Sequence, residues 1–159
     1  MNIDILCVGK LKEKYLQDAV KEYSKRLQRY CSLNIIEVPD EKAGEEQGAA
    51  LDERVKKLEG ERLRKHIKSD AYLITLEIDG KSLSSTDLAA VINDTGLKGI
   101  SRIQFVIGGS IGLSEEVMGM ADLHLSFSKM TFPHQLMRVI LLEQIYRSFK
   151  INTNEPYHK

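Results

Sequence analysis

The sequence has few cysteines, no excess of charge of either sign and no long apolar run. Its two cysteines, Cys7 and Cys31, show neither metal-ligand spacing nor a disulfide framework, so both are expected to be reduced and in or near the core. Apolar runs such as 139–142 are far too short to span a bilayer. The N-terminus has no basic region or cleavage site and is expected to form a strand. These absences predict a cytosolic protein with no membrane span and no metal site.

Lys plus Arg and Asp plus Glu each number 23, which gives a formal net charge of zero. A nonspecific binder of polyanions would show a basic excess. Neutrality therefore argues against promiscuous nucleic-acid binding. It leaves open recognition of RNA through local basic patches or through the shape of a preassembled target.

Segments with strand and helix patterns alternate along the chain. Short β-rich runs and apolar residues spaced three and four apart carry these patterns. The expected strands are residues 3–8, 33–38, 72–78, 103–107 and 123–127, and the expected helices are residues 12–30, 45–67, 88–93 and 133–150. This order predicts an α/β fold, with a single domain over residues 1–159 and a mostly parallel sheet covered by helices on both faces.

Turn and cap residues set several boundaries. Asp79-Gly80 predicts a turn that ends the third strand. Ser84 or Ser85 is expected to cap the helix that follows. Pro133 is well suited to the first position of the last helix.

Three loops are predicted to face one pocket. In parallel sheets ligands bind beyond the carboxyl ends of the strands, which here means the loops after Leu76, Ile107 and Phe127. Residues 108–112 hold three glycines, which let a ligand approach the backbone closely. The loop lacks both the G-x-G-x-x-G spacing and a following Gly-Lys-Ser/Thr. A dinucleotide fingerprint and a phosphate-cradling loop are therefore disfavoured.

The segment 125–135 joins this region to the final helix. A strand ends there, polar and aromatic side chains follow, and a helix begins at a proline, so N–H groups, hydroxyls and rings gather at a helix N-terminus. The final helix is apolar on most sides, with Leu136 and Ile140 outside its main apolar face. It is expected to be central in the monomer or to pack on a second copy, and a two-fold homodimer is favoured.

Arg138 in this helix and residues 157–159 after it could each have a structural or a functional role. Arg138 projects into the apolar face, where a charge needs a partner; a structural ion pair and the orientation of the chain terminus or of a carboxylate such as Glu143 both remain open. Residues 157–159 end the chain with an aromatic, an imidazole and a cation, which suit base stacking, proton transfer and phosphate contact. His66 and His124 lack such company and are expected to be solvated or structural.

Taken together, these residues resemble a known family. The resemblance rests on Phe105-Val-Ile-Gly-Gly-Ser-x-Gly112, Leu125-Ser-Phe-Ser-Lys-Met-Thr-Phe-Pro-His-Gln135, Arg138 and the closing residues 157–159. They are similar to the RlmH family of ribosomal RNA large-subunit methyltransferases, in the SPOUT class. The resemblance covers the whole chain, and the 125–135 block is its most specific part. The sequence departs from the family at Lys159, where some members end in arginine.

The resemblance implies a fold and an activity. It implies one α/β domain whose C-terminal segment threads a loop to form a trefoil knot, an exception to the usual rule against knots. It also implies a homodimer that uses S-adenosyl-L-methionine. The expected reaction is methylation of N3 of a pseudouridine in the helix 69 loop of 23S rRNA, on the assembled ribosome.

The resemblance also implies roles for individual residues. The cofactor pocket would be lined by Leu76, Gly108, Phe127, Ser128, Lys129, Met130, Thr131 and Phe132. His158 is the candidate base for an imide nitrogen that is protonated at neutral pH, and Tyr157 is expected to stack on or orient the base. Arg138 and Lys129 are candidates for electrostatic support. The tail is expected to complete the pocket of the partner subunit.

Two alternatives remain beside this reading. One is a knotted methyltransferase that acts on tRNA, which mapping of the methylated nucleotide would reveal. The other is a noncatalytic ribosome-binding factor, which would not bind S-adenosylmethionine.

Overall fold

The computed structural model describes residues 1–42 and 48–159. The strands within them are β1 (Asn2–Val8), β2 (Ser32–Val38), β3 (Tyr72–Ser82), β4 (Arg102–Ile107) and β5 (Leu123–Ser126). The helices are α1 (Lys14–Leu27), α2 (Ala49–Arg64), α3 (Ser85–Leu97), α4 (Glu115–Met118) and α5 (His134–Asn152). The predicted α/β order is confirmed. The short helix α4 was not predicted, and residues 45–47, expected to begin the second helix, lie outside the described residues.

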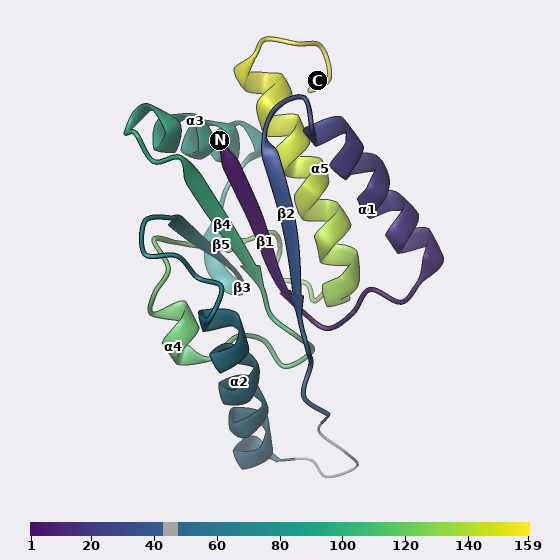
Figure 1. Ribbon diagram of the computed structural model, residues 1–159, viewed down its shortest axis with the longest axis vertical. Coiled ribbons are helices and arrows are strands. Elements are labelled where there is room, and N and C mark those ends of the chain that lie inside the picture. The colour runs from purple at the N-terminus through teal and green to yellow at the C-terminus, as the bar shows by residue number, and fades with distance from the viewer. Residues whose placement is uncertain (43–47) are drawn as a thin grey trace.

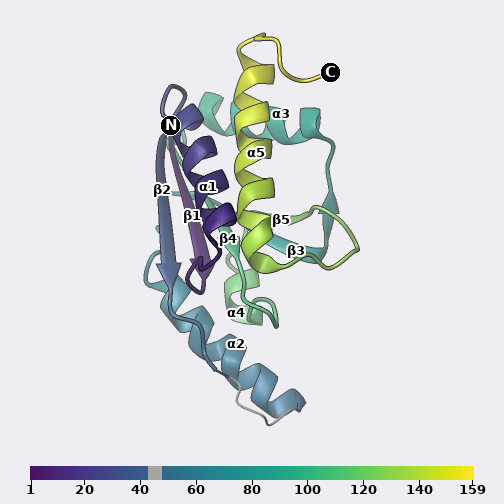
Figure 2. The same cartoon turned by 90° about the vertical axis from the view of Figure 1, so that its right-hand side faces the viewer.

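A sheet in the order β2-β1-β4-β3-β5 forms the centre of the structure, and each of its strand pairs is parallel. Helices α1, α3 and α5 cover one face, and α2 and α4 lie on the other (Figure 1, Figure 2). Helix α5 runs along the sheet between α1 and α3 (Figure 2). Because the strands are parallel, the loops after β3, β4 and β5 meet at one edge of the sheet.

Side chains alternate across the sheet into two cores. In β1, Ile3 and Cys7 belong to the core with α1, α3 and α5, whereas Leu6 and Val8 belong to the core with α2 and α4. Burial on both faces explains why the strands read as continuous apolar runs. Both cysteines are free, as predicted, with Cys7 buried and Cys31 half-buried. Burial raises the pKa of the Cys7 thiol to about 11.

The predicted turn at Asp79-Gly80 is wrong, because β3 continues to Ser82. The pairing of β3 with β5 shifts in register between Leu76 and Lys81, so the residues between them form a bulge instead of a chain reversal. Gly80 allows this, since a Cβ there would lie 2.9 Å from the backbone carbonyl carbon and oxygen of His124. The glycine thus serves close backbone approach between two strands.

Gly80→Ala is expected to lower the free energy of unfolding by about 2 kcal/mol, because backbone atoms of β5 must move to admit the methyl group. Gly96→Ala is the matched control. Gly96 lies in α3, where an added Cβ would meet only the flexible end of Met1 at 3.4 Å. Alanine should stabilise that helix by about 0.5 kcal/mol. Urea unfolding of both variants checks this, and equal stabilities would contradict the packing argument.

Helix caps confirm two boundary predictions with one adjustment. Ser84 caps α3: its side chain accepts from the Asp87 N–H, and the Asp87 side chain accepts from the Ser84 N–H. Pro133 is the N-cap of α5, one position before the predicted one. In the described part of the chain no helix combines the length and apolarity needed to cross a membrane. The trefoil knot stays a prediction.

Candidate cofactor pocket and C-terminal tail

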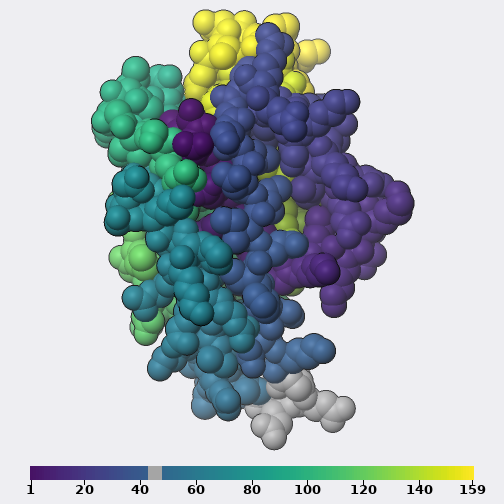
Figure 3. Space-filling model, viewed as in Figure 1, coloured from purple at the N-terminus to yellow at the C-terminus, as the bar shows by residue number. Residues whose placement is uncertain are grey.

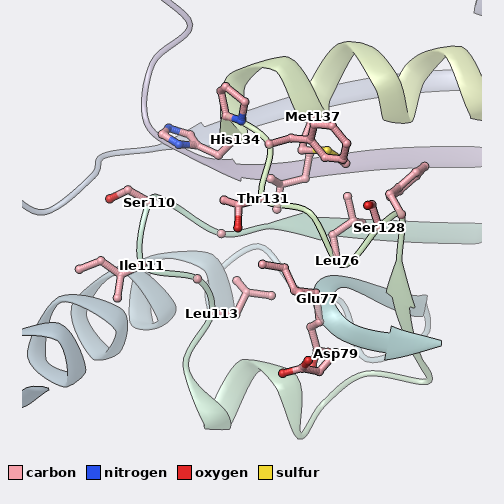
Figure 4. Close-up of a pocket in the computed structure, with 18 of the residues that line it drawn as sticks. Leu76, Glu77, Asp79, Ser110, Ile111, Leu113, Ser128, Thr131, His134 and Met137 are labelled. Carbon is pink, nitrogen blue, oxygen red and sulfur yellow. The ribbon is translucent and has the colours of Figure 1, made fainter. Parts of the chain in front are cut away.

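A cavity of about 730 Å³ opens at the carboxyl edge of the sheet. Its walls come from the bulged part of β3 at residues 76–79, from the loops after β4 and β5 and from the start of α5 (Figure 4). The lining residues are Leu76, Glu77, Ile78, Asp79, Ile107, Gly108, Gly109, Ser110, Ile111, Gly112, Leu113, Met118, Leu125, Phe127, Ser128, Met130, Thr131, Phe132, Pro133, His134 and Met137. The three segments selected from the sequence therefore do share one pocket.

The residues predicted to bind the cofactor lie around this cavity, with one exception. The structure places Leu76, Gly108, Phe127, Ser128, Met130, Thr131 and Phe132 in its lining. Lys129 is exposed and does not belong to the lining. A direct contact of Lys129 with a ligand in this cavity is therefore not supported by its position.

The glycine loop, residues 108–112, is closed tightly on itself. The Gly112 N–H donates to the Gly109 carbonyl at 3.1 Å. A Cβ on Gly108 would lie 2.8 Å from the backbone carbonyl carbon of Gly112, and Gly112 has a φ of +97°. Side chains at these positions would open the loop. The pocket wall is therefore bare backbone here.

The charged groups in the lining favour a cationic ligand. Glu77 and Asp79 carry the lining's two carboxylates, and the residues that the structure describes contribute no Lys or Arg to it. A phosphate would find no cation here, whereas a sulfonium or ammonium group would be attracted. The Thr75 hydroxyl donates to Glu77 at 2.5 Å, and His124, half-exposed, contacts the same Glu77 oxygen through Nδ1. His124 is thus a neighbour of the pocket wall.

His134, which sequence reasoning did not assign a role, stands at the N-terminus of α5 and lines the pocket across from Asp79 (Figure 4). Its imidazole packs against Gly9. Burial, with a smaller effect of the Arg138 charge, lowers its pKa. The ring is therefore neutral at neutral pH. The sequence could have indicated this role of His134, because the residue stands at the start of a predicted helix and directly after the 127–132 run.

Arg138 forms a structural ion pair, and its partner is Glu37 instead of Glu143. The side chain is 2% exposed; Nη1 donates to Glu37 at 2.6 Å, and Nη2 donates to the carbonyls of Val8 and Gly9 at 3.0 and 2.6 Å. Arg138 does not belong to the pocket lining. It fastens the chain after β1 to α5.

The C-terminal tail is folded back on α1 and α5 by one carboxylate. Glu155 accepts from the Tyr30 hydroxyl at 2.9 Å, from Lys150 Nζ at 2.8 Å and from the Thr153 hydroxyl at 3.0 Å. These hydrogen bonds, that of Lys150 foremost, lower the pKa of Glu155 to about 2. The carboxylate is ionised throughout the neutral range. Its three hydrogen bonds, from Tyr30, Lys150 and Thr153, are therefore kept at neutral pH, and we call them the Glu155 clamp.

Tyr157 and His158 follow the clamp in ordered positions. The Tyr157 ring meets the Tyr146 ring edge-on at 4.9 Å, and its hydroxyl donates to Glu143 at 3.2 Å. Arg147 stacks over the Tyr157 ring and approaches His158 Nδ1 at 3.1 Å. A guanidinium only donates, so Nδ1 accepts and the imidazole is held in one tautomer.

The tail and the pocket of one chain lie far apart. Tyr157 bonds to Glu143, the tenth residue of α5, so the folded-back tail lies about 14 Å or more along the helix from its start at the pocket. The space-filling view shows the C-terminal residues at the end of the molecule opposite α2 (Figure 3). Within one chain, the predicted base and the predicted cofactor pocket do not meet.

A family model described as "Predicted SPOUT methyltransferase" matches residues 1–158. A solved structure, that of a probable methylase family protein from Haemophilus influenzae Rd KW20, is similar in fold, with a TM-score of 0.58 at 15% identity over 99% of this chain and 70% of that chain. The chain has the fold of a SPOUT methyltransferase.

Two curated relatives give the narrower assignment. Ribosomal RNA large subunit methyltransferase H of Bifidobacterium adolescentis is 62% identical over 159 residues, which is 100% of both chains. The protein of the same name from Clostridium novyi is 60% identical over the same full length. The chain belongs to the ribosomal RNA large subunit methyltransferase H family.

Proposed function

We propose that this protein uses S-adenosyl-L-methionine to methylate N3 of a pseudouridine in the helix 69 loop of 23S rRNA, on the assembled ribosome in the cytoplasm. The names of the full-length relatives support a large-subunit rRNA target. The cofactor assignment rests on the lining of the pocket. The lining has apolar walls, exposed glycine backbone and two carboxylates, and no cation is found among its described residues.

The lining suits each part of this cofactor. Apolar side chains such as Leu76 and Phe127 can sandwich the adenine, and backbone groups of the glycine loop and of the 127–132 run can bond its polar edge. Glu77 and Asp79 supply negative charge for the sulfonium and ammonium groups. When bound, the cofactor supplies an electrophilic methyl group on sulfur.

The protein must also remove a proton from the target nitrogen, because the imide is protonated at neutral pH. His158 is our candidate for the base. In the single chain its basic nitrogen, Nδ1, accepts from Arg147 while Nε2 carries the ring proton, so the imidazole would have to release Arg147 before it takes a proton from the target. Tyr157 would stack on or orient the nucleobase. Lys129, which is exposed and outside the pocket lining, would give electrostatic support to the RNA rather than to the cofactor. Arg138 would act indirectly, by fixing the loop beside His134.

A homodimer would bring the tail of one subunit to the pocket of the other. The pocket lining supports this, because it includes none of residues 157–159 of the same chain. Leu136 and Ile140, which lie outside the main apolar face predicted for α5, are half-buried in the single chain. A two-fold contact along α5 would cover this apolar stripe and place the two chains in opposite directions.

The deciding experiment is methyl transfer from labelled S-adenosylmethionine to intact ribosomes, separated subunits and tRNA, with the modified nucleotide identified by mass spectrometry. Labelling of one pseudouridine in 23S rRNA of intact ribosomes is the expected result. Labelled tRNA would establish the first alternative. Absence of cofactor binding in calorimetry would favour the noncatalytic one.

A further inference from the structure

A buried carboxyl group of α2 lies directly behind the glycine loop. Glu59 is 4% exposed. Its Oε2 accepts from the Glu41 backbone N–H at 3.0 Å. Its Oε1 is buried and has no hydrogen-bond partner among the described residues. An unpaired buried oxygen is costly, and such groups in native structures call for an explanation.

The unpaired oxygen faces the pocket wall. A Cβ on Gly109 would lie 3.1 Å from Oε1 and 3.3 Å from Oε2 of Glu59. The next residue, Gly60, lies against the chain just beyond the loop: a Cβ there would lie 2.5 Å from Ser114 Oγ. Glu59 and Gly60 therefore lie against Gly109 and Ser114, on either side of residues 110–113, which line the pocket.

Donors are available on the loop itself. No acceptor is found in the described part of the chain for the backbone N–H groups of Ser110 and Ile111. Gly109 has no side chain to hold the loop away from the carboxyl group. A small shift of the loop toward α2 would let one of these N–H groups donate to Oε1.

We propose that Glu59 is a positioning residue for the glycine loop: binding of the cofactor brings a loop N–H to Oε1, and Glu59 gives up a proton as this bond forms. The proposal rests on the proposed cofactor. In this step the carboxyl proton passes to water, and the resulting carboxylate accepts a hydrogen bond from the loop N–H.

The charges around Glu59 fit this coupling. Burial raises its pKa in the free protein, Asp40 and Glu41 raise it further, and the Glu41 N–H and Arg62 oppose them. The glycine loop carries no charged side chain. A new hydrogen bond to the ionised form would lower the pKa in the bound state. By linkage, cofactor affinity should then increase as pH rises through the free-state pKa and level off above it.

The test is calorimetry of S-adenosylmethionine binding in two buffers of different ionisation enthalpy, across acidic to neutral pH. The wild type should release protons on binding, and Glu59→Gln should release fewer. At neutral pH the dissociation constant of Glu59→Gln should be about tenfold higher. Glu61→Gln, the same change at an exposed position two residues away, should match the wild type. Titration of His134, Glu77 and Asp79 is common to all three proteins, so the difference isolates Glu59.

Two results would overturn the proposal, and they have different meanings. Wild-type binding without proton release, or with the same release in Glu59→Gln, would remove the role of Glu59 and leave the cofactor assignment intact. Failure of the wild type to bind S-adenosylmethionine would remove both. If Glu59→Gln does not fold, the wild type still tests the proposal, because cofactor binding without proton release would overturn it.

Discussion

Deletion of residues 157–159 is expected to slow single-turnover methyl transfer by at least about a hundredfold, the usual contribution of a positioned base, while leaving S-adenosylmethionine affinity unchanged. The reason is geometric. Residues 157–159 do not belong to the lining of their own chain's pocket, so their loss removes no residue of that lining. His158→Ala should reproduce most of the loss if its imidazole is the base.

The tail's conformation should matter as well as its residues. Glu155→Gln keeps Tyr157 and His158 but weakens the bonds from Lys150 and Tyr30, so we expect an intermediate loss of rate. Glu61→Gln is the matched control, because it makes the same change at an exposed position of α2, away from the tail, and should keep the wild-type rate. A rate equal to wild type for Glu155→Gln would show that the clamp is irrelevant.

Mixed dimers decide whether the tail acts on the partner. One subunit lacks residues 157–159, and the other carries Gly108→Ala, whose added Cβ would lie 2.8 Å from the Gly112 backbone and distort the pocket wall. Each parent dimer should be inactive. The mixed dimer should regain activity at one of its two sites, because it pairs an intact pocket with an intact tail. No recovery would exclude action in trans.

Much of this architecture could be predicted because it depends on local pattern. Apolar runs gave the strands, and the order of elements placed the loops after Leu76, Ile107 and Phe127 at one edge of the sheet. The pocket follows from that order alone, since parallel strands end together. The prediction for Asp79-Gly80 failed for the opposite reason: the glycine is set by contact with β5, more than 40 residues away in sequence.

The remaining features of the site depend on pairs distant in sequence. Glu155 is held by Tyr30, 125 residues earlier. Glu59 reads as one more charge on a solvated helix, and only the fold shows that it is buried behind the glycine loop. For Arg138 the sequence left open a structural ion pair and the orientation of a carboxylate such as Glu143; Arg138 forms an ion pair with Glu37, which is 101 residues earlier, and Glu143 pairs with Arg147. Ion pairs between different helices and strands therefore could not be predicted from the local sequence pattern.

Arg138→Ala is expected to lower the free energy of unfolding by about 3 kcal/mol or more. The change leaves the Val8 and Gly9 carbonyls without their donor and removes the partner of Glu37. Glu37, which also accepts from the Leu11 N–H, would then no longer connect the loop after β1 to α5. Arg64→Ala is the control: its pair with Glu116 is exposed, and its removal should cost less than about 1 kcal/mol.

Urea unfolding of the two variants, with cofactor binding measured where each is still folded, separates the two interpretations of Arg138. A structural role predicts a large loss of stability, and partial rescue by Arg138→Lys, which keeps the charge but loses the forked geometry. A catalytic role predicts wild-type stability with slow methyl transfer. Because a domain of this size has only about 5–15 kcal/mol of stability, loss of this one side chain should also be visible as a lower yield of folded protein.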